Sequence, residues 1–155
     1  MNTEAMDTAE TTLTRNKDIV HAFIDALFTK GDLGAVDDYL AEDFVNHNPP
    51  FGMPGDREGM RSAGAVFREA FPDWHSEPYQ MIAEGDLVVE HFTAAGTQRG
   101  DLLGVPAPAQ DGPDRPVTLH GINIFRVRGD RIAEQWCQLD ELGVLRQLGI
   151  ISSEA

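Results

Sequence analysis

The 155-residue sequence contains a single cysteine, Cys137, and few basic residues. One cysteine excludes a disulfide within the chain and is compatible with a reducing cytoplasm. Lys and Arg number 12 against 26 Asp and Glu, which gives a formal net charge of −14. A field of this sign repels phosphate backbones and anionic lipid surfaces. We therefore expect a cytoplasmic protein that binds neither nucleic acid nor membranes.

Long apolar runs are also missing from the sequence. No segment approaches the roughly 20 apolar residues of a membrane-spanning helix. The N-terminus has neither the basic residues nor the apolar core of a signal peptide. Residues 1–12 are acidic and polar, which is typical of a flexible tail. Residues 13–155 are long enough to form a single domain with its own hydrophobic core.

Motifs for metal, phosphate or nucleophilic chemistry are absent as well. No two of the five histidines stand at i,i+4 or i,i+2 spacing, so no metal site is visible; they are His21, His47, His75, His91 and His120. No Gly-rich stretch precedes a helix in the form that binds phosphate. No Gly-x-Ser-x-Gly motif occurs either. We expect a protein that uses no cofactor and no metal ion.

The order of the secondary-structure signals indicates the fold class. Apolar residues recur at a helical period over residues 13–30, 33–40 and 56–71. From residue 79 onward they alternate as in strands, apart from a Gly- and Pro-rich loop over residues 100–115. Helices followed by strands favour an α+β domain, in which the helices cover one face of a sheet. A curved sheet would leave a space for a ligand beneath the helices.

The stretch from Pro116 to Gly143 predicts a β-hairpin that carries polar residues within two apolar strands, joined at Gly129–Asp130. Asp140 stands at the end of the second strand, where its carboxylate either caps the following turn or is held in a pocket. An apolar pocket would raise its pKa and suit it to general acid/base catalysis. His120, in the first strand, is a candidate to polarise a carbonyl or to hydrogen-bond this carboxylate.

The sequence leaves open whether His120 and Asp140 share a face of the sheet. With a two-residue link His120 lies opposite Leu139, and Asp140 then points to the other face. With a three-residue link or one bulge His120 lies opposite Gln138, and both side chains share a face.

Five longer segments resemble, in their order and spacing, the SnoaL-like family of polyketide cyclases and ester cyclases within the nuclear-transport-factor-two-like superfamily. They are AEDFVNHNP (41–49), AFPDWH (70–75), IAEGDLVV (82–89), GTQRGDLLGVPAP (96–108) and the run from His120 to Gly149. The resemblance covers roughly residues 16–150. It implies a cone-shaped domain whose curved, mixed sheet packs against N-terminal helices and encloses a pocket. It also implies a homodimer formed through the sheet.

In the cyclases that the sequence resembles, an aspartate of the last strand is the general acid/base of an intramolecular aldol ring closure. The matching position here is Asp140, within the pattern Trp136-x-x-x-Asp140-x-x-Gly143. The sequence departs from the family at Gln98, where histidine is frequent, and at His91, where arginine is frequent. These departures leave the substrate open, and with it the reaction.

The resemblance also places residues 44–48 at the rim of the pocket. His47 or Asn46 would contact ligand oxygens there, although His47 is equally explained as a loop histidine in solvent. Phe44 is expected on the inner wall of the pocket, where core and pocket are the same surface.

Three further residues are candidates for substrate binding. Trp74 and Trp136 offer flat apolar faces on which an aromatic substrate can stack, and a place in the hydrophobic core is the alternative for both. His91, on the strand predicted over residues 87–97, is either a ligand contact or a structural histidine.

The sequence therefore predicts a cofactor-independent enzyme that acts on a small, carbonyl-rich compound of aromatic or polyketide-like character, with Asp140 and His120 as catalytic residues. One alternative is a hydrolase or isomerase that uses the same acid. Epoxide hydrolysis would call for an Asp–Arg–Asp relay, to which Arg126 and Arg99 are the available arginines. The other alternative is a non-catalytic dimeric module that binds a small ligand.

Overall fold

The fold is described from a computed structural model that covers residues 3–152 and leaves residues 1–2 and 153–155 undescribed. Helices dominate the first half of the chain and strands the second half. In chain order the elements are α1 (Thr3–Ile24), the π-helical turn η1 (Asp25–Thr29), α2 (Ala35–Tyr39), β1 (Leu40–Asn46), the 3-10 turn η2 (Pro50–Gly52), α3 (Arg57–Ala70), β2 (His75–Glu84), β3 (Leu87–Thr97), β4 (Pro116–Arg128), β5 (Arg131–Leu139) and α4 (Glu141–Gln147).

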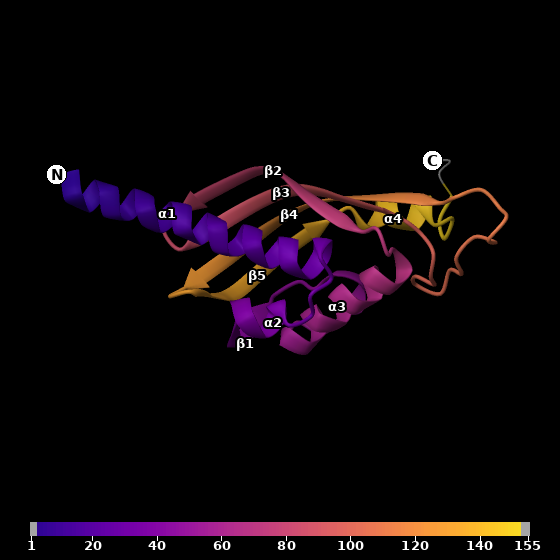
Figure 1. The fold of residues 1–155 in the computed structure, drawn as a ribbon, viewed down its shortest axis with the longest axis horizontal. Coiled ribbons are helices and arrows are strands. Elements are labelled where there is room, and N and C mark those ends of the chain that lie inside the picture. The colour runs from indigo at the N-terminus through magenta and orange to yellow at the C-terminus, as the bar shows by residue number, and fades with distance from the viewer. Residues whose placement is uncertain (1–2, 153–155) are drawn as a thin grey trace.

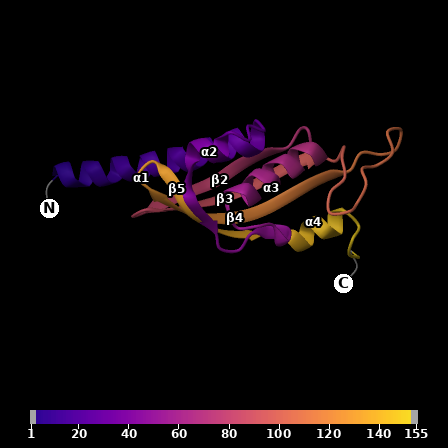
Figure 2. The ribbon, with the colours of Figure 1, turned by 90° about the horizontal axis from the view of Figure 1, so that it is seen from below.

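Five strands form one sheet in the order β1-β5-β4-β3-β2. Neighbouring strands are antiparallel except β1 and β5, which are parallel. Helices α1, α2 and α3 lie on one face of this curved, unclosed sheet, and α4 packs near one end of it against β4 (Figures 1 and 2). The predicted α+β class, with a mixed curved sheet behind N-terminal helices, is confirmed.

Helix α1 starts at Thr3, ahead of the predicted start near Leu13. Residues 3–12, predicted as a flexible tail, are helical and project beyond the sheet (Figure 1); residues 1–2 of that tail lie outside the described residues. Three hydroxyls in the stretch donate to the carbonyl four residues earlier, those of Thr8, Thr11 and Thr12. Because its side chains are exposed, this part of the helix carries no apolar stripe for the sequence to show.

Strand β1 replaces part of a predicted helix. The sequence predicts a helix over residues 33–40, whereas α2 covers Ala35–Tyr39 and Leu40 already begins β1. β1 pairs in parallel with β5, which lies far away in the sequence. Parallel pairing needs no hairpin turn beside the strand, so the local signal that identifies the other strands is missing.

The β4–β5 hairpin contains a bulge that the sequence left open. The link is the two-residue turn Gly129–Asp130, but the pairing shifts by one residue between Arg126 and Val127, and Ala133 is the extra residue on β5. The shift places His120 opposite Asp140, whose backbone N–H donates to the His120 carbonyl at 2.9 Å. The bulge therefore brings these two residues together at the end of the hairpin.

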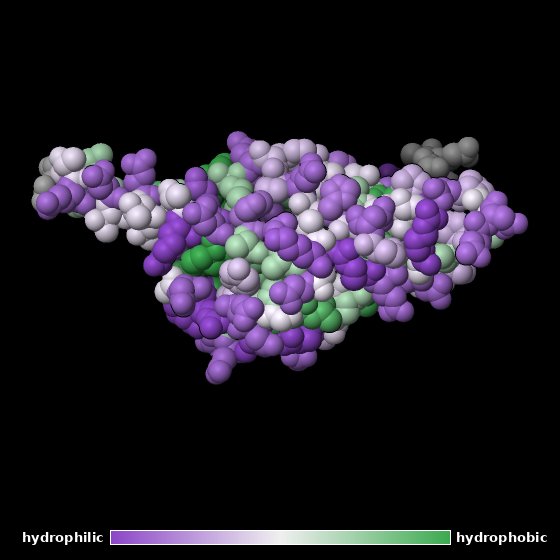
Figure 3. Space-filling view, viewed as in Figure 1, coloured by the Kyte–Doolittle hydropathy of each residue, from purple (hydrophilic) through white to green (hydrophobic). Residues whose placement is uncertain are grey.

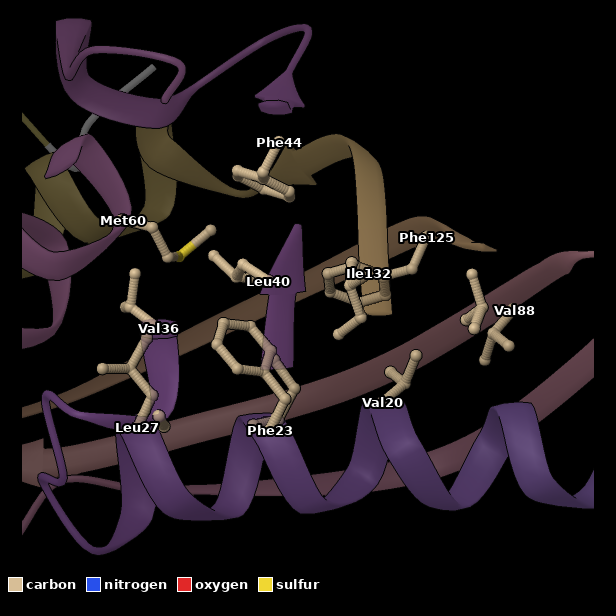
Figure 4. Packing of buried hydrophobic residues seen from close by; sticks show 13 residues of the cluster. Val20, Phe23, Leu27, Val36, Leu40, Phe44, Met60, Val88, Phe125 and Ile132 are labelled. Carbon is tan, nitrogen blue, oxygen red and sulfur yellow. The ribbon is translucent and has the colours of Figure 1, made fainter. Parts of the chain in front are cut away.

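Two groups of buried apolar side chains hold the helices to the sheet. The first packs α1 onto the sheet and onto β1, as Figure 4 shows, and includes Val20, Phe23, Leu27, Leu40, Phe44, Phe125 and Ile132. The second lies around the end of α3 and includes Phe67, Phe71, Trp74, Phe92, Leu119 and Val144. Full burial of one such side chain contributes about 1.5–3 kcal/mol.

The remaining surface is mostly polar. Hydrophilic residues cover most of the face in Figure 3, including the projecting start of α1. None of the helices within residues 3–152 has both the length and the apolar character of a membrane span.

Candidate functional site

A cavity lies between the inner face of the sheet and the helices, with about 750 Å³ of space outside the atoms, part of it open to solvent. Inward side chains of the strands, α3 and the segment between β1 and α3 form its wall. Most of the wall is apolar and partly aromatic, with Phe28, Met60, Phe67, Trp74, Phe92 and Leu119. An apolar, aromatic-walled space of this kind can take up a flat organic ligand.

Four adjacent strands each place one polar side chain into this apolar wall. Glu90 on β3 pairs with Asn123 on β4, and Asn46 on β1 pairs with Gln135 on β5. All four line the cavity, and none is more than 6% exposed. Asn123 Nδ2 donates to Glu90 Oε2 at 3.2 Å, and Gln135 Nε2 donates to Asn123 Oδ1 at 2.9 Å. We call Glu90, Asn123, Gln135 and Asn46 the polar track.

Glu90 is the ionisable member of the polar track. It is 1% exposed, and burial raises the pKa of its carboxyl to about 7, because the apolar surroundings disfavour the charged form. The hydrogen bond from Asn123 stabilises the charged form and acts in the opposite direction. A carboxyl group with this pKa populates both protonation states near neutral pH, so it can take up a proton and give it back.

Cys137 also lines the cavity, on the strand that carries Gln135. Burial, together with the charges of Glu141 and Glu90, raises the pKa of its thiol to about 12. The side chain therefore stays a neutral thiol at physiological pH and is a poor nucleophile. Residues 3–152 contain no group of three or more His, Cys, Asp and Glu side chains that could hold a metal ion.

The segment between β1 and α3 forms one side of the cavity, through Pro49, Pro50, Met53 and Pro54 among others. Asn48 fastens this segment to β5, because its side-chain amide donates to the carbonyl of Cys137 and accepts the Cys137 N–H at 2.7 Å. Gly59 allows close packing, since a Cβ there would lie 1.9 Å from the Pro54 carbonyl oxygen. Both contacts fix the cavity wall next to the polar track.

Residues 18–148 match the family model described as SnoaL-like polyketide cyclase. The chain belongs to this family. The match spans all five strands, helices α2, α3 and α4, and α1 from residue 18 onward. A comparison with curated protein sequences found no match.

Solved structures support the same assignment. IdmH from Streptomyces antibioticus, a candidate polyketide cyclase, is 32% identical, with a TM-score of 0.71 over 86% of this chain and 98% of that chain. TsrD from Streptomyces laurentii is 28% identical, with a TM-score of 0.75 over 89% and 97% of the two chains. An epoxide hydrolase of M. tuberculosis is 19% identical, with a TM-score of 0.66 over 90% and 92%. At that identity it shows a shared fold alone.

In this SnoaL-like chain Asp140 is exposed and lies outside the cavity wall. Its Oδ1 accepts the backbone N–H of Gly143 at 2.9 Å, so it is the N-cap of α4. Glycine at position 143, the last residue of the Trp136-x-x-x-Asp140-x-x-Gly143 pattern, leaves room for this cap, because a Cβ there would lie 2.2 Å from Asp140 Oδ2. The capping alternative is thus what the structure shows. A general acid/base role for Asp140 stays a prediction that its position does not support.

His47 and Trp136 lie on the outer face of the sheet, which we define as the face away from α1, α2 and α3. Their rings stack with centroids 4.8 Å apart, and Arg126 lies 5.7 Å from the Trp136 ring. His47 Nε2 is 3.0 Å from Glu134 Oε1, and Arg126 Nε also donates to Glu134. These two hydrogen bonds lower the pKa of Glu134. None of these side chains lines the cavity.

The other two predicted histidines are exposed on the outer face as well. His91 contacts the ring of Tyr79 edge-on, with centroids 5.2 Å apart. His120 Nδ1 lies 3.3 Å from Thr93 Oγ1, and Thr93 in turn hydrogen-bonds Tyr79. The bulge in β5 places Ile122, and not His120, opposite Gln138. The structure thus gathers His47, His91, His120 and Trp136 on the face opposite the cavity.

Of the predicted binding residues, Asn46 and Trp74 line the cavity, whereas Phe44 is buried in the first core cluster. Glu90 is the residue that the sequence-based prediction missed. It occupies an inward position of an alternating strand, between Val88 and Phe92 on the same face. A carboxylate in an otherwise apolar row is rarely buried without a reason, and this was the available signal.

Proposed function

We propose that the chain catalyses proton transfer on a small carbonyl compound, in an aldol-type ring closure, with Glu90 as general acid/base. The observation that carries this proposal is a buried carboxyl group whose pKa is raised to about 7, inside the apolar cavity of a SnoaL-like chain. Ring closure requires a proton to leave carbon and a proton to reach the new alkoxide. One carboxyl group poised near neutrality can perform both steps, at a gain of about 10²–10⁴-fold.

The neighbours of Glu90 support this role. Asn123 donates to Oε2 and so holds the carboxylate in place on the cavity wall. Trp74 and Phe92 provide apolar surface beside it, against which the rings of a flat substrate can pack. The preferred substrate is therefore carbonyl-rich and aromatic or polyketide-like, in keeping with the family.

Two matched substitutions decide between the buried acid and the acid predicted from the sequence. Glu90→Gln and Asp140→Asn each replace a carboxylate with an amide of the same shape, and asparagine remains a good helix cap. The 1,3-diketone 2-acetyl-1-tetralone serves as a probe, because its acidic proton exchanges in D₂O and NMR can follow the exchange. We expect Glu90→Gln to lose about 10²–10⁴-fold in catalysed exchange and Asp140→Asn to keep the wild-type rate. The reverse pattern would assign the role to Asp140.

The two alternatives to ring closure differ in their outcomes. A hydrolase or isomerase could use Glu90 equally well, but neither Arg126 nor Arg99 lines the cavity, so neither is placed to join an Asp–Arg–Asp relay there. Arg126 pairs with Asp86 and Glu134, and Arg99 pairs with Asp114. A binding module without catalysis would show exchange no faster than buffer alone, which would contradict the proposal.

The homodimer is a proposal of its own, and the outer face is the surface we assign to it. Large apolar side chains are exposed there at Tyr79 (61%), Ile82 (53%), Ile122 (47%) and Val45 (43%). Association through this face would remove them from water. Sedimentation of the wild type and of Ile122→Glu tests it, and a wild type that stays monomeric at high micromolar concentration would contradict it.

A further inference from the structure

Gln135 is the last residue in the hydrogen-bonded part of the polar track, and one of its two side-chain polar atoms makes no hydrogen bond within the described residues. The residue lines the cavity and is 5% exposed. Its Nε2 donates to Asn123, whereas its Oε1 is buried and has no hydrogen-bond partner among the described residues. Buried side-chain oxygens are nearly always hydrogen-bonded, so the missing partner of Gln135 Oε1 requires an explanation.

The ionised form of Glu90 determines which atom of Gln135 has no partner. In that form the carboxylate only accepts hydrogen bonds, and Asn123 directs its Nδ2 toward Glu90. Asn123 then directs Oδ1 toward β5, where it accepts a hydrogen bond from Gln135 Nε2. Every donor in the row points toward Glu90. With Glu90 ionised, this order leaves an acceptor, Gln135 Oε1, at the opposite end of the row.

The neighbouring strand, β1, provides no hydrogen-bond donor to Gln135 Oε1. Asn46 pairs with Gln135 across the β1–β5 ladder, but its Oδ1 accepts the backbone N–H of Asn48. No hydrogen bond joins the side chains of Asn46 and Gln135 within the described residues. Both side chains line the cavity, so a donor carried by a ligand would come from that side.

We propose that the ligand of this cavity carries a hydroxyl or N–H group that donates to Oε1 of Gln135. This deepens the function proposed above and rests on it in one respect, namely that the acidic carbon of the same ligand lies at Glu90. The substrate class narrows from carbonyl compounds in general to hydroxylated ones, such as phenols and enols that also carry a carbonyl group.

The spacing of the two groups sets the size of the ligand. Glu90 on β3 and Gln135 on β5 are separated by β4 and by a two-residue offset along β5, so their backbones stand at least two interstrand distances apart, roughly 10 Å or more. A ligand that serves both groups must extend across β4, past Asn123. A fused-ring compound has this reach, whereas a three- or four-carbon ketone does not.

A pair of probes that differ in one donor tests the proposal without any turnover. We suggest calorimetric titration with 2-naphthol, which has a hydroxyl donor, and with its methyl ether 2-methoxynaphthalene, which has none. The measured quantity is the ratio of the two dissociation constants within each variant, so differences in stability between variants cancel. The matched control is Gln138→Leu, the same substitution on the same strand at an exposed position.

We expect the ratio to favour 2-naphthol in the wild type and in Gln138→Leu, and to fall by roughly three- to tenfold in Gln135→Leu. Gln135→Met provides a second variant of similar length if Gln135→Leu folds poorly. An unchanged ratio in the Gln135 variants would overturn the proposal and indicate that water, and not the ligand, donates to Gln135 Oε1. Because this readout is binding and that of Glu90→Gln is exchange, either proposal can fail while the other holds.

Discussion

Glu90 and Glu134 are two glutamates of one sheet that face opposite sides. Glu90 points inward, and burial raises its pKa to about 7. Glu134 points outward, where hydrogen bonds from His47 and Arg126 lower its pKa. The same functional group is therefore poised for proton transfer on one face and held as a stable anion on the other. Surroundings, and not residue type, decide which of them can do chemistry.

The contrast extends to the two faces as a whole. On the inner face amide side chains link Glu90 to its neighbours in an apolar wall. On the outer face the three histidines are exposed, His47 contacts Glu134, and Arg126 lies over the half-buried ring of Trp136. The outer face holds more of the residue types that usually attract a functional prediction. The inner face holds the carboxyl group whose pKa is raised to about 7.

The largest effect expected of the unmodified protein is the pH dependence of exchange. As a general base Glu90 must be ionised, so kcat/KM should fall by about tenfold for each pH unit below 7 and level off above it. Exchange of 2-acetyl-1-tetralone between pH 5 and 8 measures this profile, and Asp140→Asn should reproduce it. A rate that stays constant over this range would show that Glu90 is not the general base, and the proposed catalytic role of the inner face would be contradicted.

The sequence predicts the parts of the fold whose signal is local. Helix α3, which is capped by Asp56 and ends at Ala70, and the alternating strand β3 lie where their apolar periods place them. Strand β1 depends on a distant partner, β5, and its own residues do not show it. Long-range pairing of this kind is invisible to a reading of neighbouring residues.

The candidate site was harder to predict, because a single bulge decides part of it. Ala133 shifts the register of β5, and no residue type in the hairpin requires a bulge at that position. Asp140 matched a family pattern yet serves as a cap. Glu90 could have been found from the sequence, since strand parity alone puts it among buried apolar residues.

The second prediction concerns the stability of Glu90→Gln. Both the folded and the unfolded protein carry the Glu90 proton below the ordinary pKa of 4.5, and both have lost it above about 7. The folded state therefore bears the cost of the buried charge only as the pH rises through this window. We expect Glu90→Gln to stabilise the protein by up to about 3 kcal/mol at pH 8 and by little at pH 4.

Urea unfolding at these two pH values measures the difference, and Glu134→Gln is the matched control. The pKa of Glu134 is lowered in the folded state, so its charge stabilises the fold above its ordinary pKa. Glu134→Gln should therefore lose stability at pH 8, opposite in sign to Glu90→Gln. Changes of the same sign in both variants would contradict the comparison.

The third prediction separates structure from chemistry at Asp140. Asp140→Ala removes the acceptor of the Gly143 N–H and should cost about 1 kcal/mol in the free energy of unfolding. The exchange rate per folded molecule should stay at the wild-type value, because the residue lies outside the cavity wall. Chemical denaturation and the diketone assay, performed on the same sample, check both halves. A loss of the exchange rate larger than tenfold would indicate that Asp140 takes part in catalysis.

The smallest effect is expected at His47, an outer-face residue that the sequence predicts as a ligand contact. His47→Ala removes the ring stacked on Trp136 and the partner of Glu134. Exposed ion pairs contribute little, so the urea midpoint should move less than in Asp140→Ala. The affinity for 2-naphthol should not change, because the sheet separates His47 from the cavity. If affinity did fall, ligand binding would involve both faces, and the inner face would no longer account for recognition alone.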